Sequence, residues 1–214
     1  MGLHLCYELR LPDHLSPDDV DNVLGAMHAH ALTLPFDQVG PPTRMLQSTG
    51  ARSWVQLWAS IIAKPHEEDV PPMVGEADTA RAFLVNAGSG CETAIFGFLL
   101  RGDEAGSTRE WFWHACCKTQ YASTVSDAHL IKCHTSLVAL LDHAVTVGVD
   151  VVVRDETHYW ETRDEKRLLA EVGEMNRIVA RLAGRFADIL GDEHHLEAPI
   201  FEHPRFEHLE MDEE

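Results

Sequence analysis

The chain has 214 residues, of which 45% are hydrophobic and 24% are charged, a composition typical of a globular protein with a core of its own. Thirty-five acidic residues against 17 basic ones give a formal net charge of -18, which would repel the phosphates of nucleic acids and anionic lipid surfaces. We therefore expect a soluble single-domain protein that binds neither nucleic acid nor membrane.

Cysteine usage and the first residues of the chain indicate its compartment. The five cysteines are odd in number and widely spaced apart from Cys116 and Cys117, unlike the disulfide framework of a small secreted domain. Residues 1–11 lack the basic region and apolar run of a signal peptide, and no apolar stretch approaches the ~20 residues that span a bilayer. We expect a cytoplasmic protein with reduced thiols.

The amino-terminal part predicts a strand followed by a helix. Leucine and tyrosine alternate with polar residues over residues 3–11, which is the period of a strand with one apolar face. Residues 16–19 read Ser-Pro-Asp-Asp and combine a capping hydroxyl, a proline for the first helical turn and acids for the positive helix end. Apolar residues then follow at helical spacing, so we expect a helix that ends at about Pro35.

The next part of the chain predicts an insertion and a hairpin. Residues 36–79 have a weak pattern interrupted by two proline pairs, and we interpret them as an insertion or lid, with a slight preference for a helix around residues 54–62. Residues 81–87 and 92–100 predict two strands joined by a Gly-Ser-Gly turn, which is a β-hairpin. A phosphate loop is disfavoured because no Gly-Lys-Ser/Thr sequence follows these glycines.

We place residues 111–123 at the centre of the fold. This segment reads Trp-Phe-Trp-His-Ala-Cys-Cys-Lys-Thr-Gln-Tyr-Ala-Ser, with the aromatic bias of a central strand and more ionisable side chains than a structural strand needs. A helix capped at Ser126 and stopped at Gly148 follows, and then a valine-rich strand at residues 149–153.

The carboxy-terminal part predicts one long helix and a tail. Residues 162–165, Thr-Arg-Asp-Glu, have the spacing of a capping box and precede apolar residues at helical spacing as far as Gly191. Residues 192–214 are acidic and rich in histidine but include some large apolar residues. We expect this tail to pack partly against a single α+β domain formed by residues 1–191.

The order of elements is the βαββαβ pattern of a ferredoxin-like α+β sandwich with an inserted segment after the first helix, a β-hairpin and an extra C-terminal helix. In that architecture we expect residues 3–11 and 111–123 to form parallel neighbouring strands at the centre, with helices on one face only. Sheets of this kind often pair through their open faces, so we also expect a homodimer.

Strand alternation predicts a polar open face. If the helices cover the face with Leu5, Tyr7 and Trp113, the side chains in between must point the other way, and neighbouring strands lie only ~4.8 Å apart. The open face would then collect His4, Cys6, Glu8 and Arg10 from the first strand and His114, Cys116, Lys118 and Gln120 from its neighbour.

The favoured interpretation of this face is structural, with Glu8 paired to Lys118 or Arg10. A second interpretation is a zinc or iron site, because imidazole and thiolate are common ligands of both metals. The spacing is unlike the usual Cys-x-x-Cys knuckles. The metal ligands in this interpretation would be His4, Cys6, His114 and Cys116.

A third interpretation of the face is catalytic. Cys116 would be the nucleophile and His114 the base, with Lys118 and Glu8 in support, because thiol chemistry needs a lowered pKa and a proton acceptor. No third residue to orient the base can be named.

Ligand-binding residues are also expected where the sheet ends. The loop after residues 149–153 contains acids and an aromatic residue that could grip a substrate or simply lead into the next helix, and a tyrosine could close the polar face. The predicted ligand-binding residues are His4, Arg10, Gln120, Tyr121, Asp155, Glu156 and Trp160.

Taken together, these features favour a binding or interaction domain that recognises a small molecule or a basic protein partner. The strong acidity favours the cationic partner. The alternative is a thiol- or metal-assisted enzyme that uses His114 and Cys116.

Overall fold

The computed structural model describes residues 3–46, 79–102, 109–190, 199–204, 206 and 209. The strands are β1 at His4–Leu11, β2 at Gln38–Val39, β3 at Thr43–Leu46, β4 at Thr79–Asn86, β5 at Ala94–Gly102, β6 at Arg109–Lys118 and β7 at Asp150–Asp155. The helices are α1 at Pro17–Ala31, α3 at Asp127–Thr146, α4 at Tyr159–Thr162 and α5 at Glu165–Leu190, with short 3-10 helices η3 at Gln120–Thr124 and η4 at Pro199–Glu202.

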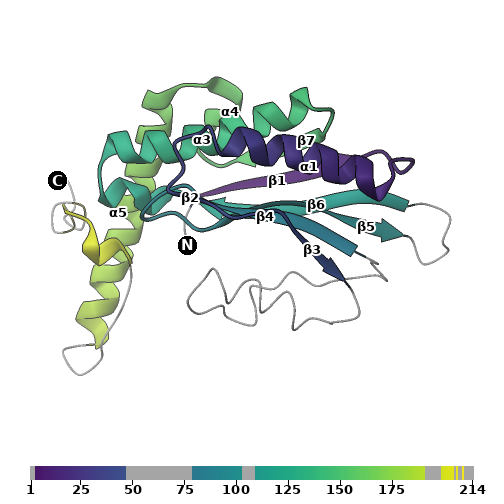
Figure 1. The fold of residues 1–214 in the computed structure, drawn as a ribbon. Coiled ribbons are helices and arrows are strands. Elements are labelled where there is room, and N and C mark those ends of the chain that lie inside the picture. Colours follow the sequence, from purple (N-terminus) through teal and green to yellow (C-terminus); the bar gives the residue numbers. More distant parts are fainter. Residues whose placement is uncertain are drawn as a thin grey trace.

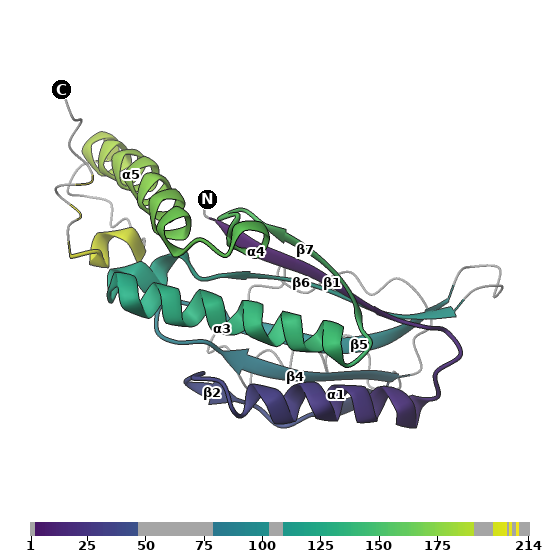
Figure 2. The same cartoon turned by 90° about the horizontal axis from the view of Figure 1, so that it is seen from above.

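These elements form a mixed α+β fold around an open, seven-stranded antiparallel sheet (Figure 1). The order across the sheet is β2-β4-β5-β6-β1-β7, and β3 also pairs with β4. Helices α1 and α3 lie side by side over one face of the sheet, while α5 extends beyond one end of it (Figure 2). Within the described ranges, no helix has the length and apolar character needed to cross a membrane.

Helix α1 begins where the sequence predicted, because Ser16 and Asp19 cap each other. The Asp19 N–H donates to Ser16 Oγ at 3.2 Å, and the Ser16 N–H donates to the Asp19 carboxylate at 3.0 Å. The apolar side of the helix packs on the sheet, where Val20 is fully buried. The helix ends at Ala31 rather than at about Pro35, and tighter turns follow it, in which the N–H groups of Thr33 and Leu34 donate to the carbonyls of His30 and Ala31.

The predicted hairpin is confirmed as β4 and β5, with strand bounds shifted by one or two residues. Phe83 lies opposite Phe96, and the two rings stack with their centroids 5.6 Å apart. The connecting loop contains Gly90 with a φ of +79°, where a Cβ atom would lie 2.3 Å from the Tyr121 carbonyl oxygen. Only glycine therefore allows this loop to pack against η3.

Strands β1 and β6 are central neighbours as predicted, but they run antiparallel, so the expected parallel pairing is wrong. The strand that runs parallel to β1 is β5, because β6 lies between them and pairs antiparallel with both. The assignment of faces is nevertheless confirmed. Leu5, Tyr7 and Leu9 lie opposite Cys117, Ala115 and Trp113 on the helix-covered side, because directly paired residues share a face in either orientation.

The start of α5 differs from the predicted capping box. Thr162 ends the short helix α4, and Arg163 then adopts a left-handed conformation with a φ of 55°. Asp164 caps α5 instead, because its carboxylate accepts the N–H groups of Lys166 at 2.9 Å and Arg167 at 3.3 Å. The capping signal in the sequence is real but begins two residues later than predicted.

The predicted insertion and tail lie largely outside the described residues. Within the predicted insertion at residues 36–79, β2 and β3 pair with β4, while residues 47–78, including the expected helix, lie outside the description. Of the tail, η4 places the fully buried Ile200 against Ala180 and Ala183 of α5.

Candidate functional site

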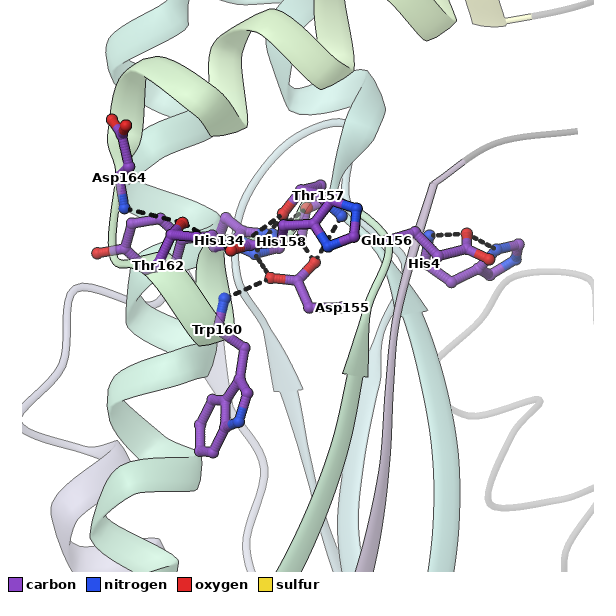
Figure 3. Close-up of polar contacts among 11 residues, drawn as sticks. His4, His134, Asp155, Glu156, Thr157, His158, Trp160, Thr162 and Asp164 are labelled. Atoms are coloured by element: carbon purple, nitrogen blue, oxygen red, sulfur yellow. Dashed lines mark hydrogen bonds and ion pairs between the residues drawn. The ribbon is translucent and has the colours of Figure 1, made fainter.

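Several predicted ligand-binding residues meet at one end of the sheet, where β1 begins and both β6 and β7 end. Lys118 lies opposite His4 there, and Asp155 lies opposite Leu5. The His4 N–H donates to the Glu156 carboxylate at 2.9 Å, and the Glu156 N–H donates to the His4 carbonyl at 3.1 Å (Figure 3). The backbone bond extends the β1–β7 pairing by one residue, and the side-chain bond adds a second link between His4 and the start of the loop that follows β7.

The carboxylate of Asp155 organises that loop. Its Oδ1 atom accepts the Thr157 N–H at 2.9 Å and the Thr157 hydroxyl at 2.7 Å. Its Oδ2 atom accepts the Trp160 N–H at 2.8 Å and lies 3.1 Å from Nε2 of His134 on α3 (Figure 3). The side chain is fully buried, so these contacts replace the water that a charged group would otherwise need.

The same contacts set the charge of Asp155. Burial raises the pKa of this carboxyl, but the hydrogen bond and charge of His134 and the hydrogen bonds from Thr157 outweigh burial and lower the pKa to about 2. Asp155 is therefore ionised at neutral pH. A buried anion with this many fixed donors is a strong local constraint on the backbone.

His134 connects this loop to the end of β6. Its Nδ1 atom lies 2.9 Å from the Thr119 hydroxyl, and its ring is only 1% exposed. The ring of Tyr159 packs edge-on against it, with centroids 5.6 Å apart. Thr119, Asp155, Thr157 and Tyr159 enclose the ring, so His134 of α3 links the end of β6 to the loop.

The loop backbone has two unusual conformations that frame α4. His158 and Arg163 have φ angles of 59° and 55°, a region that costs non-glycine residues on the order of 1–3 kcal/mol each. Thr162 closes the loop, since its hydroxyl donates to the His158 carbonyl at 2.7 Å. Strain of this kind persists only where the surroundings impose one conformation, and such sites are often functional.

We define the acidic-aromatic loop as residues 156–165. Its exposed surface contains Glu161, Asp164 and Glu165, and Glu156 is one third exposed. Tyr159 and Trp160 are half-buried. The Arg163 guanidinium lies 4.6 Å from the centroid of the indole ring of Trp160 and pairs with Asp142 of α3 at 2.7 Å.

Gln120 does not lie on the open face, so that part of the prediction is wrong. It begins η3 and is buried, where its amide donates to Asn176 of α5 at 2.8 Å and accepts the Leu3 N–H at 2.9 Å. The Asn176 amide in turn donates to the Ser123 hydroxyl at 2.9 Å. These contacts join the residue before β1 to η3 and α5. The neighbouring Tyr121 is half-buried, and burial raises its pKa.

The predicted open face forms on the other side of β1 and β6, but its cysteines are not free thiols. Cys6 and Cys116 lie directly opposite each other and form a disulfide, which corrects the expectation that every thiol is reduced. The third interpretation required a free Cys116 thiol, and the disulfide occupies that sulfur. His114 lies opposite Glu8, whose carboxylate pairs with Arg10 at 2.7 Å as the structural interpretation predicted.

Lys118 does not pair with Glu8. Its ammonium lies 3.3 Å from the carboxylate of Glu92, a residue of the loop between β4 and β5. The Lys118 N–H also donates to Glu92 at 2.9 Å, so the hairpin loop is attached to the end of β6.

The predicted zinc or iron site is wrong for the part of the chain that the structure describes. There, no group of three or more His, Cys, Asp or Glu side chains is arranged to hold a metal ion. The reason is local: the sulfurs of Cys6 and Cys116 are bonded to each other, and Nδ1 of His4 lies 3.3 Å from Glu156.

Sequence reasoning missed four buried polar residues: Thr119, His134 and Thr157 in the network around Asp155, and Asn176, which contacts Gln120. One signal was available, because His134 occupies the buried stripe of the helix between Leu130 and Leu137 and needs a polar partner there.

Comparisons with known proteins returned no matching family model, no matching curated protein and no matching solved structure.

Proposed function

We propose that this protein is an interaction domain that uses the acidic-aromatic loop to recognise a basic segment of a protein partner. The observation that carries the proposal is the buried, ionised Asp155, which holds Thr157 and Trp160 and so fixes the loop before any partner binds. A surface ordered in advance loses less conformational entropy on binding.

Charge supports a cationic partner. Glu161, Asp164 and Glu165 are exposed within five residues of the loop, and the only arginine or lysine in residues 156–165, Arg163, is already paired with Asp142. Glu156 adds negative charge beside them but is paired with His4 and Arg154. The net charge of -18 would attract a basic partner over a distance, and the local acids would orient it.

The aromatic residues support arginine in particular. Trp160 is half-buried, and its indole ring already lies 4.6 Å from the guanidinium of Arg163, which supports contact of this ring with cations. Arginine can both stack on such rings and form paired hydrogen bonds to carboxylates, which lysine cannot do.

We also propose a fold family, a compartment and an assembly state for this protein. The strand order β7-β1-β6-β5 with α1 and α3 on one face supports a ferredoxin-like core to which β4, β2 and β3 add an edge. We propose the cytoplasm as the compartment, and a homodimer as the assembly state, which light scattering after gel filtration tests.

The test uses a fluorescein-labelled arginine-rich peptide, followed by fluorescence anisotropy, with a glutamate-rich peptide as the negative control. We expect binding of the arginine-rich peptide only, with an affinity that falls as salt rises. The substitutions Glu161→Gln and Glu165→Gln should each weaken binding about threefold, as loss of one exposed ion pair implies.

The matched control is Asp13→Asn, which removes an exposed acid beyond the opposite end of β1. It should leave the affinity unchanged. Equal affinities for both peptides, or equal losses in the loop variants and the control, would refute recognition by the loop.

A further inference from the structure

We propose that the Cys6–Cys116 disulfide is a thiol–disulfide exchange site on the open face of the sheet, with a dithiol as its co-substrate. The inference does not rest on peptide binding by the acidic-aromatic loop. It rests on the exposure of Cys116, on the register of β1 and β6, and on the polar side chains around the disulfide.

Access favours attack at Cys116. Cys116 is exposed on β6, whereas Cys6 is half-buried on β1, between β6 and β7. An attacking thiolate must approach a disulfide sulfur directly, so exposure decides which sulfur is attacked. The geometry therefore assigns Cys116 as the attacked sulfur and Cys6 as the leaving thiolate.

The surroundings allow the thiolates to exist. His114 and Lys118 flank Cys116 along β6 on the same face, and Arg154, which is 82% exposed, lies opposite Cys6 on β7. Of the acids near the disulfide, Glu8 pairs with Arg10, Glu92 with Lys118, and Glu156 with His4 and Arg154. A polar face in contact with water solvates a thiolate and does not raise its pKa as a core would.

Cys117 gives the internal contrast. It is adjacent to Cys116 but faces the core, where it is fully buried and its thiol donates to the Glu92 carbonyl at 3.1 Å. Burial raises the pKa of the Cys117 thiol well above its ordinary value. Two neighbouring cysteines on β6 therefore differ in reactivity because a strand alternates its faces.

The exchange balances in two steps. A thiolate of the dithiol attacks Sγ of Cys116, the Cys6–Cys116 bond breaks, and its electron pair leaves on Sγ of Cys6, which takes up a proton from water. The second thiolate of the dithiol then attacks the dithiol's own sulfur in the mixed disulfide, so that the dithiol closes to its disulfide and Cys116 leaves as a thiolate. The protein disulfide is reduced by two electrons, and the dithiol is oxidised to its disulfide.

The sheet also favours the reverse reaction, in which the two thiols form the disulfide again. The paired register of β1 and β6 runs from His4 opposite Lys118 to Leu11 opposite Trp111. Backbone pairing at both sides of Cys6 keeps the two thiols opposite each other after reduction, so closing the bond requires no refolding.

The experiment equilibrates the full-length protein with mixtures of reduced and oxidised dithiothreitol, starting from both directions. Each mixture is quenched in denaturant with a maleimide polymer that adds mass to every free thiol. We expect a reversible shift between three and five modified cysteines, since Cys91, Cys117 and Cys133 are free throughout. The far-ultraviolet circular dichroism should stay constant across the transition.

The Cys6→Ser/Cys116→Ser variant serves as the background and should show three modified cysteines in every mixture. In the single variants, the freed Cys116 of Cys6→Ser should react with a chromogenic disulfide at least about threefold faster than the freed Cys6 of Cys116→Ser. Five modified cysteines at every ratio, a transition seen only in denaturant, or faster reaction at Cys6 would overturn the proposal.

Discussion

Replacing Asp155 with asparagine tests how much the buried carboxylate stabilises the protein. The difference between the ordinary pKa of 3.8 and about 2 in the folded protein corresponds to about 2 kcal/mol. Because the folded-state pKa is lowered, this stability is present above about pH 4 and is lost as the pH falls towards 2. The side-chain amide introduced by Asp155→Asn would also direct its NH₂ group at the N–H of Thr157 or of Trp160, so we expect a total loss of about 3 kcal/mol at pH 7.

The assay is urea unfolding at several pH values, followed by circular dichroism. The wild-type free energy of unfolding should fall more steeply between pH 4 and pH 2 than that of Asp155→Asn, with Asp13→Asn as an exposed control within about 0.5 kcal/mol of wild type. A loss below about 1 kcal/mol at pH 7, or the same pH slope in Asp155→Asn and wild type, would show that Asp155 does not support the fold as described.

Three further substitutions test the structure around the site. Gln120→Ala should lower the free energy of unfolding by about 2 kcal/mol in urea titrations, because Asn176 and the Leu3 N–H lose a buried partner; a neutral result would contradict this role. Cys6→Ser should lower it by up to about 4–5 kcal/mol under oxidising conditions and by far less in excess dithiothreitol, since the bond closes a loop of 110 residues. Gly90→Ala should lower the thermal midpoint by several degrees, because of its φ of +79° and the close Tyr121 carbonyl, and an unchanged midpoint would show that the loop can shift freely.

Patterns that depend on one element were predictable from the sequence. The alternation of residues 3–11 gave the buried face of β1, and the Ser16 and Asp19 cap gave the start of α1. The turn glycines gave the β4–β5 hairpin. Each of these signals is local, because strand period, capping and turn chemistry act within a few residues.

Features that depend on contacts between distant residues were not predictable in the same way. Cys6 and Cys116 are 110 residues apart in the sequence and meet only because β1 and β6 pair in one particular register. The parallel pairing expected for these strands was wrong. Gln120 left the open face because the chain turns into η3 after Lys118, and its partner Asn176 comes from α5. Alternation within a strand contains no information about where that strand ends in space.

The predicted ligand-binding residues also differ in how far their positions and contacts could be predicted from the sequence. His4 and Glu156 do meet, because the sheet brings the start of β1 next to the end of β7, whereas the Asp155 side chain lies on the helix-covered face, opposite Leu5. Asp155 has a structural role, however, because its carboxylate accepts the Thr157 N–H and lies against His134. The loop was recognisable by composition, while its fixed conformation was visible only through the buried partners.

Mapping of amide resonances by nuclear magnetic resonance during titration with the arginine-rich peptide tests recognition by the acidic-aromatic loop most directly. We predict that the largest shifts fall on residues 156–165, including the Trp160 indole N–H, and that they fade as salt rises. The amides of α1, which lies on the far side of α3 from α5, should not move (Figure 2). Shifts confined to residues outside the loop, or no shifts at peptide concentrations that saturate the anisotropy signal, would contradict the account.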